Sequence, residues 1–424
     1  MSLLVLSTEI LLLIFSHDFL SPSDLYHIIQ TCRRTYDIGI VSLYRKVCIS
    51  ARPNHFIPGK YIVTNLKALS EGVHQQPALA SFVHSAELYW ETDCPGRTNK
   101  LLALLSKFTS IKSLDLACAY GTCSTSMLVR NIAAFKSLSN LRQMTLTAHH
   151  TTMDMDDLAT LLRSIPNLDA FCLKQFDGFN SPSSSCGPPS KLMEIEFLDA
   201  VQLPVGGAME WFLAGQPALR TLTWTIAMNV QPFKNWSVAL VDRALSPLKP
   251  HLVNLCLAIV GSHCNQWLEC RIQLDCSEFV MLESLEVHEH FIFGTTSIPG
   301  SAPGDCRVEK YHRKDLSARL PSSLETLTIN FHTGSKILEK AIKHEKSEDY
   351  SWILALARFK GKRFEKLTRL NIVEIANSNA HRANSQTPGI AAVEWEYPLD
   401  VEKAFRSAGI ALQVMLRPQH QVRR

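Results

Sequence analysis

The sequence lacks the features that mark membrane, secreted and nucleic-acid-binding proteins. No stretch of its 424 residues is apolar enough to span a bilayer, and the Leu- and Ile-rich segment Leu3–Phe19 is interrupted by Glu9 and Asp18. No Lys or Arg precedes that segment, so it does not resemble a signal peptide. The formal net charge is only +4, which is too low to indicate a nucleic-acid-binding protein. We expect no membrane or nucleic-acid partner and a cytoplasmic or nuclear location, not a secreted protein.

Motifs for catalysis and metal binding are also missing. The densest cysteine cluster, Cys264, Cys270 and Cys276, does not have the spacing of about two to four residues that zinc ligands favour. Gly206-Gly207 lacks a following Lys-Ser or Lys-Thr, and no Gly-x-Ser-x-Gly elbow occurs. The 12 cysteines are expected to be free thiols in a reducing compartment. We therefore predict no cofactor, no metal site and no catalytic residue.

Three short helical patterns occupy the first 48 residues. Ser7 can cap the first helix, and the phrase Ser21–Asp24 is a start signal for the second, with Pro at the first helical position. The second helix carries an apolar stripe at helical spacing, formed by Leu25, Ile28, Ile29 and Cys32. A unit this small buries little of its own surface. We therefore expect some of its apolar side chains to need a partner.

Several residues in this stretch match the sequence pattern of a known helical module. The set comprises Leu6, Glu9-Ile10-Leu11, Ile14-Phe15, Leu20, Asp24-Leu25, Cys32-Arg33 and Leu43-Tyr44-Arg45. It resembles an F-box, through which a substrate receptor docks on the Skp adaptor of cullin–RING ubiquitin ligases. Ser7 replaces the usual Pro, and Leu43-Tyr44 replaces the usual Trp, a variant similar to F-box-like proteins of mushroom-forming fungi. The alternative is a helical cap on the domain that follows, with no adaptor.

The resemblance implies a non-catalytic receptor subunit whose partners are a Skp adaptor, a cullin reached through that adaptor, and a protein client. The residues predicted to contact the adaptor are Leu6, Ile10, Leu11, Ile14, Phe15, Leu20 and Leu25. The alternative for this set is that about half of its members only pack the three helices together.

One pattern, apolar-x-x-apolar-x-apolar, recurs through the rest of the chain. Its ten instances begin at Val83, Ile111, Leu141, Leu168, Leu192, Leu219, Leu252, Leu282, Leu324 and Leu367. Successive starts lie 24 to 43 residues apart, with helical periodicity in several of the intervening segments. This spacing is typical of a leucine-rich-repeat solenoid, in which stacked strand–helix units share one core.

These patterns together predict an α/β fold in two parts. We expect an F-box-like module over residues 3–48, a connector over 49–80, an irregular leucine-rich-repeat solenoid over 81–416 and a tail over 417–424. Short parallel strands would line the concave side and helices the convex side. The Asn or Cys that usually follows each strand is absent, which predicts irregular curvature. The alternative is an ordinary α/β domain with a parallel sheet, although that would favour longer, fully apolar strands.

Residues between the apolar strand positions would face the open, concave side. Those predicted to contact a client are Asp115, Thr145, Glu196, Thr223, Glu286, Thr328 and Asn371. Cys172 and Cys256 occupy equivalent positions. A row of polar groups suits protein recognition, and together with the resemblance to an F-box it implies substrate recognition for a ubiquitin ligase. The alternatives are an interaction scaffold without a ligase role and an enzyme, for which no motif occurs.

Three polar loops, Gly178–Ser190, Gly294–Asp305 and Asn377–Gly389, are expected at the surface.

Overall fold

The structure is a computed structural model. It describes residues 5–16, 20–50, 66–90, 95–118, 129–130, 132–133, 135–148, 152–180, 182, 190–200, 207–227, 238–260, 273–293, 295–297, 306–308, 315–331, 351–376 and 399–418. The chain divides into two compact units, Met1–Phe176 with Ser190–Leu192, and Asp177–Pro189 with Met193–Arg424. Each unit is described by itself.

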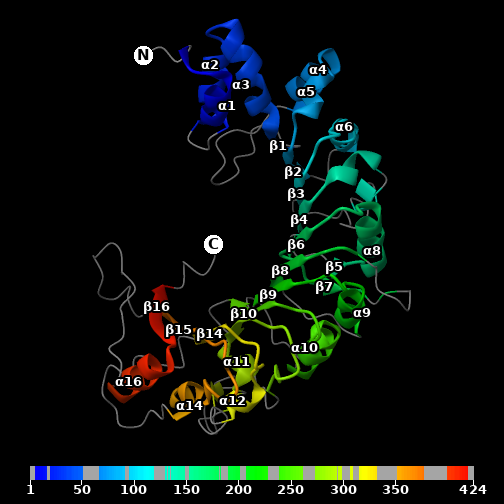
Figure 1. Cartoon of the computed structure of the whole chain (residues 1–424). Coiled ribbons are helices and arrows are strands. Elements are labelled where there is room, and N and C mark those ends of the chain that lie inside the picture. The colour runs from blue at the N-terminus through cyan, green and yellow to red at the C-terminus, as the bar shows by residue number, and fades with distance from the viewer. Residues whose placement is uncertain are drawn as a thin grey trace, which may run out of the picture. The chain divides into compact units, whose positions relative to one another are not determined.

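The first unit begins with the three helices predicted from the sequence (Figure 1). They are α1 (Thr8–Phe15), α2 (Pro22–Ile29) and α3 (Arg33–Arg45). The Ser7 hydroxyl caps α1 by accepting a hydrogen bond from the Ile10 amide, at 3.4 Å. Ser21 and Asp24 form the reciprocal capping box that begins α2. The start signals in the sequence therefore act as predicted.

The remainder of the first unit is a parallel sheet with helices alongside it (Figure 1). Its strands lie in the order β1 (Lys46–Ser50), β2 (Ser85–Trp90), β3 (Ser113–Cys118), β4 (Gln143–Thr147) and β6 (Ala170–Lys174). The helices are α4 (Leu66–Gln75), α5 (Ala78–Ser81), α6 (Pro95–Leu105) and α8 (Met155–Ser164), with a 3-10 turn at Lys136–Asn140 and a short strand β5 (Thr152–Met153).

The second unit repeats the same arrangement. Its parallel strands lie in the order β8 (Glu194–Ala200), β9 (Thr221–Ala227), β10 (Asn254–Val260), β11 (Ser284–His288), β14 (Thr326–Phe331), β15 (Arg369–Ala376) and β16 (Ala411–Pro418). The helices are α9 (Ala208–Ala214), α10 (Val238–Leu245), α11 (Glu289–Ile292), α12 (Leu316–Arg319), α14 (Ser351–Phe359) and α16 (Leu399–Ala408), with a 3-10 turn at Ser246–Leu248. Short strands complete it, namely β7 (Gly178–Phe179) and the antiparallel pair β12 (Thr295–Ser297) and β13 (Cys306–Val308).

All ten repeated patterns in the sequence correspond to strands of these sheets. The second and third apolar positions of each pattern form buried rows, as Leu222 and Trp224 of β9 align with Leu255 and Leu257 of β10. Aromatic side chains fill part of this core, with the Phe197 ring 6.2 Å from the Trp224 ring, centroid to centroid. The predicted repeat of strands and helices is therefore confirmed.

The segment predicted as a connector contains regular structure. Strand β1 begins at Lys46, before the predicted end of the helical module, and α4 and α5 lie within residues 49–80. Val47 and Ile49 of β1 are buried against the next strand. Two alternating apolar residues are too weak a signal to predict a strand, which is why the sequence pattern did not reveal β1.

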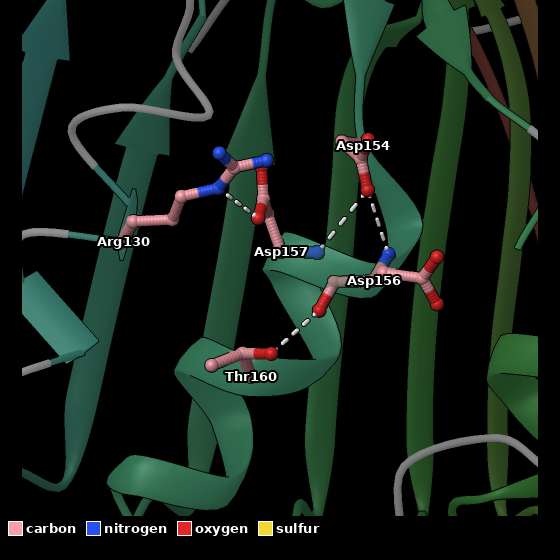
Figure 2. A network of polar contacts seen from close by, with 5 residues as sticks. All are labelled: Arg130, Asp154, Asp156, Asp157 and Thr160. Atoms are coloured by element: carbon pink, nitrogen blue, oxygen red, sulfur yellow. Dashed lines mark hydrogen bonds and ion pairs between the residues drawn. The ribbon is translucent and has the colours of Figure 1, made fainter. Parts of the chain in front are cut away.

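Helix α8 shows how polar side chains fix the start of a helix in this fold (Figure 2). Asp154 caps it, because one carboxylate oxygen accepts hydrogen bonds from the amides of Asp156 and Asp157, at 2.9 and 3.2 Å. Arg130 donates from Nε to the buried carboxylate of Asp157 at 2.6 Å. This ion pair connects the segment before β4 to helix α8. The Thr160 hydroxyl donates to the Asp156 carbonyl, at 2.8 Å.

Candidate functional site

The helical module has an apolar core of its own. Leu11, Phe15, Leu25 and Ile38 are buried together, and half-exposed apolar residues pack against them, namely Leu6, Ile14, Leu20, Ile28 and Leu43. Three of the seven residues predicted to contact an adaptor, Leu11, Phe15 and Leu25, therefore pack inside the module. Leu6, Ile14 and Leu20 lie at the edge of this core.

The other side of α1 is apolar and exposed. The exposed fractions of Ile10, Leu12 and Leu13 are 45%, 40% and 69%. Ile10 and Leu13 are three residues apart, so they are neighbours on the helix surface. On the next helix Tyr26 is also exposed, at 52%. Leu13, the most exposed of them on α1, is absent from the set predicted from the sequence, although its spacing from Ile10 was a usable signal.

Polar contacts hold the start of α1 against α3. The Arg34 guanidinium donates to the Leu6 carbonyl at 2.7 Å. The pKa of Glu9 is lowered by a backbone hydrogen bond and the Ser7 hydroxyl, with a smaller contribution from the charge of Arg34. A carboxylate at this position also suits the positive end of the helix dipole. The Ser7 cap and the Arg34 hydrogen bond therefore hold the start of α1, the helix that has the exposed apolar side.

The close approach of the helices depends on a glycine in α3. A Cβ atom at Gly39 would lie 2.5 Å from Cγ2 of Ile29 on α2 and 3.6 Å from Cδ2 of Phe15 on α1. A contact of 2.5 Å is well inside van der Waals separation. Only a residue without a side chain allows the three helices to meet in this way.

Helix α3 continues into the sheet without a linker. It ends at Arg45, and β1 begins at Lys46. The His84 amide donates to the Arg45 carbonyl at 2.9 Å, and Lys46 Nζ lies 3.0 Å from Glu87 Oε1 on β2. The junction between the helical module and the first repeats is thus held by a backbone hydrogen bond and an ion pair.

The central polar positions of the strands stand in rows, as predicted. In the first unit Asp115 aligns with Thr145. In the second unit the aligned residues are Glu196, Thr223, Cys256, Glu286, Thr328 and Asn371. All of these side chains are half-exposed. They therefore form an ordered polar surface between the buried apolar rows.

Members of this surface form hydrogen bonds with side chains of neighbouring strands. Asn371 Nδ2 donates to the Thr328 hydroxyl at 2.9 Å, and Asn330 Nδ2 donates to Glu286 Oε1 at 2.8 Å. Burial raises the pKa of Cys256 to about 12, and the carboxylates of Glu286 and Glu196 add to the rise. Cross-strand hydrogen bonds of this kind hold side chains in defined positions.

The described ranges hold no group of three or more His, Cys, Asp or Glu residues arranged to bind a metal ion. Cys276 is a buried free thiol, whereas Cys264 and Cys270 lie outside the described residues. Within the same ranges no helix has the length and hydropathy needed to cross a membrane. Most of the three predicted loops also lies outside the described residues, namely 294, 298–305, 377–389 and most of 178–190. The described parts of these loops include β7 (Gly178–Phe179) and β12 (Thr295–Ser297).

Comparison with known proteins identifies a family match at the amino-terminal helices. The F-box-like family matches residues 8–50, a span that includes all of α1, α2, α3 and β1. No curated protein matches the chain. Among solved structures, the leucine-rich repeat-containing protein LegL7 from Legionella pneumophila is similar, with a TM-score of 0.39 and 14% identity over 86% of this chain and 97% of that one.

Proposed function

We propose that this protein is a substrate-recognition subunit of a Skp–cullin–F-box ubiquitin ligase. The F-box-like domain at residues 8–50 would bind a Skp adaptor, and through it a cullin, while the repeats would bind a protein client. The chain itself would catalyse nothing. Its role would be to bring a client lysine close to a charged ubiquitin-conjugating enzyme, which raises the effective concentration of the two reactants. This role places the protein in the cytoplasm or nucleus.

The observation that carries the adaptor proposal is the exposed apolar side of α1. Ile10 and Leu13 would lose exposed apolar surface on binding, and burial of such surface is the main favourable term in most protein association. We assign direct contact to these two residues, with Leu12 beside them and the half-exposed Leu6, Ile14 and Leu20 at the edge of the core. Leu11, Phe15 and Leu25 are left out of the proposed contact surface, because their side chains are buried in the core of the module.

Client binding is proposed for the polar row of each unit. Asp115, Thr145, Glu196, Thr223, Glu286, Thr328 and Asn371 remain the candidates. Within each unit they are half-exposed and held at fixed spacing by the strands, about 4.8 Å apart in the hydrogen-bonding direction. A rigid surface that offers donors and acceptors at regular intervals loses little conformational freedom on binding.

Co-purification from a native extract tests the adaptor proposal. A variant with Ile10→Asp and Leu13→Asp would place charges on the exposed side of α1 without entering the core. A matched control, Val280→Asp with Met281→Asp, adds the same charges at positions that are 67% and 43% exposed in the second unit. We expect the Skp adaptor and cullin to be lost from the first variant and kept by the control. Recovery of the adaptor with both variants would refute contact through the exposed side of α1, whereas failure to recover it with the parent chain would favour the scaffold without a ligase role.

A further inference from the structure

A column of basic residues crosses the first unit at the point where each strand begins. Arg45, His84, Lys112 and Arg142 each directly precede a strand, β1, β2, β3 and β4 respectively. We call these four residues the basic ladder. The His84 amide donates to the Arg45 carbonyl at 2.9 Å, Lys112 to His84 at 2.8 Å and Arg142 to Lys112 at 2.8 Å. Because neighbouring strands lie about 4.8 Å apart, the ladder is about 14 Å long.

The charges of the basic ladder face the solvent. Arg45, Lys112 and Arg142 are exposed, and His84 is half-exposed. Arg142 lies 3.4 Å from a carboxylate oxygen of Asp169 at one end, whereas Arg45 and Lys112 have no ion pair within the described residues. The pKa of His84 is lowered by burial and further by the charges of Lys112 and Arg45. The cations are thus close enough to affect one another.

The repeat does not require basic residues at this position. In the second unit the same backbone ladder runs through Met193, Arg220, Val253, Glu283, Glu325 and Thr368. These residues differ in charge and polarity, so the hydrogen-bonding geometry tolerates any of them. Like charges on adjacent strands repel and reduce stability. Apart from the contacts of Arg142 with Asn167 and Asp169, the basic charges therefore reduce stability and contribute nothing to the backbone ladder.

We propose that the basic ladder is a docking surface for an acidic polypeptide segment, rich in Asp and Glu. Carboxylates spaced along such a segment would pair with Arg45, Lys112 and Arg142, and would remove the repulsion between them. Arg45 is also the last residue of α3, so the ladder begins where the F-box-like domain ends. The inference does not rest on the proposed function, because it concerns a different surface and a different kind of contact.

Peptide binding to the full chain tests the inference. The probes are fluorescein-labelled octaglutamate, the matched octaglutamine and a labelled short duplex DNA, each titrated by fluorescence anisotropy. The test variant is Arg45→Gln with Lys112→Gln. The control is Lys362→Gln with Lys366→Gln, which removes the same charge from two exposed residues of the second unit. Thermal unfolding of both variants shows whether they are folded, and we expect the test variant to be at least as stable as the parent chain.

We expect octaglutamate to bind more tightly than octaglutamine, and the test variant to weaken that binding by about five-fold while the control leaves it unchanged. Added salt should weaken the binding of octaglutamate to the parent chain. An equal loss with both variants would overturn the inference, since it would show attraction to overall charge. Tighter binding of the duplex than of octaglutamate would also overturn it, in favour of a nucleic acid.

Discussion

Replacement of Gly39 by alanine tests how closely the three helices of the F-box-like domain pack. The added methyl group would lie 2.5 Å from Cγ2 of Ile29 and 3.6 Å from the Phe15 ring. Cγ2 is bonded directly to the Cβ atom of Ile29, so it moves only if the side chain changes rotamer or α2 shifts. The methyl group therefore cannot be accommodated without disturbing a neighbouring helix.

Two opposing terms set the size of the effect. Alanine favours the helical backbone over glycine by up to about 1 kcal/mol. Overpacking of a core costs about 1–3 kcal/mol. We expect Gly39→Ala to destabilise the domain by about 1–2 kcal/mol, because the contact is far inside normal separation. Gly361→Ala is the control, since a Cβ atom there has no neighbour within 4 Å.

Native-state hydrogen exchange of the full chain measures this effect at the domain itself. A loss of about 1–2 kcal/mol corresponds to exchange about 5- to 30-fold faster for amides that open with α2 and α3. The strands of the second unit should keep their rates. If Gly39→Ala slowed exchange in α2 and α3, or matched Gly361→Ala, the close packing described for α3 would be refuted.

Three further predictions concern single side chains. Leu11→Ala should cost about 2–5 kcal/mol and Leu13→Ala less than about 0.5 kcal/mol in denaturant unfolding, because the first side chain is buried and the second exposed; equal costs would contradict the two sides assigned to α1. The hydroxyl and then the amide of Ser21 lower the pKa of Asp24, so its contribution to α2 is present above about pH 4 and lost as the pH falls through its folded-state pKa. Asp24→Asn should abolish this acid-dependent opening of α2 in hydrogen exchange, and persistence of the opening would count against the capping box. Asp154→Ala should cost about 1 kcal/mol and speed exchange at the start of α8, while unchanged rates there would show that the cap contributes nothing.

The repeat could be predicted from the sequence because its signals are redundant. Each strand shows three apolar residues at fixed spacing, and the pattern returns ten times, so a weak instance such as the one at Val83 is supported by the others. Strand β1 offers only Val47 and Ile49, directly after a helix, and has no such support. Its position is fixed by pairing with β2, which is information that no local pattern contains.

The candidate adaptor surface was harder to predict because five consecutive residues of α1 are apolar. Ile10, Leu11, Leu12, Leu13 and Ile14 are consecutive, so no polar stripe shows which side faces inward. Packing against α2 and α3 decides that Leu11 is buried and Leu13 exposed. The basic ladder was missed for another reason. Its members lie 28 to 39 residues apart in sequence and are brought together only by the strand register.

The central claim is that the exposed side of α1 binds a Skp adaptor. Isothermal titration of the full chain with a purified Skp adaptor tests it most directly, with the Ile10→Asp, Leu13→Asp variant compared with the Val280→Asp, Met281→Asp control. We predict saturable binding by the parent chain and the control, and affinity lower by at least about 30-fold for the α1 variant, as expected when central apolar contacts are lost. Binding of equal strength by the α1 variant, or no binding by the parent chain, would contradict the claim.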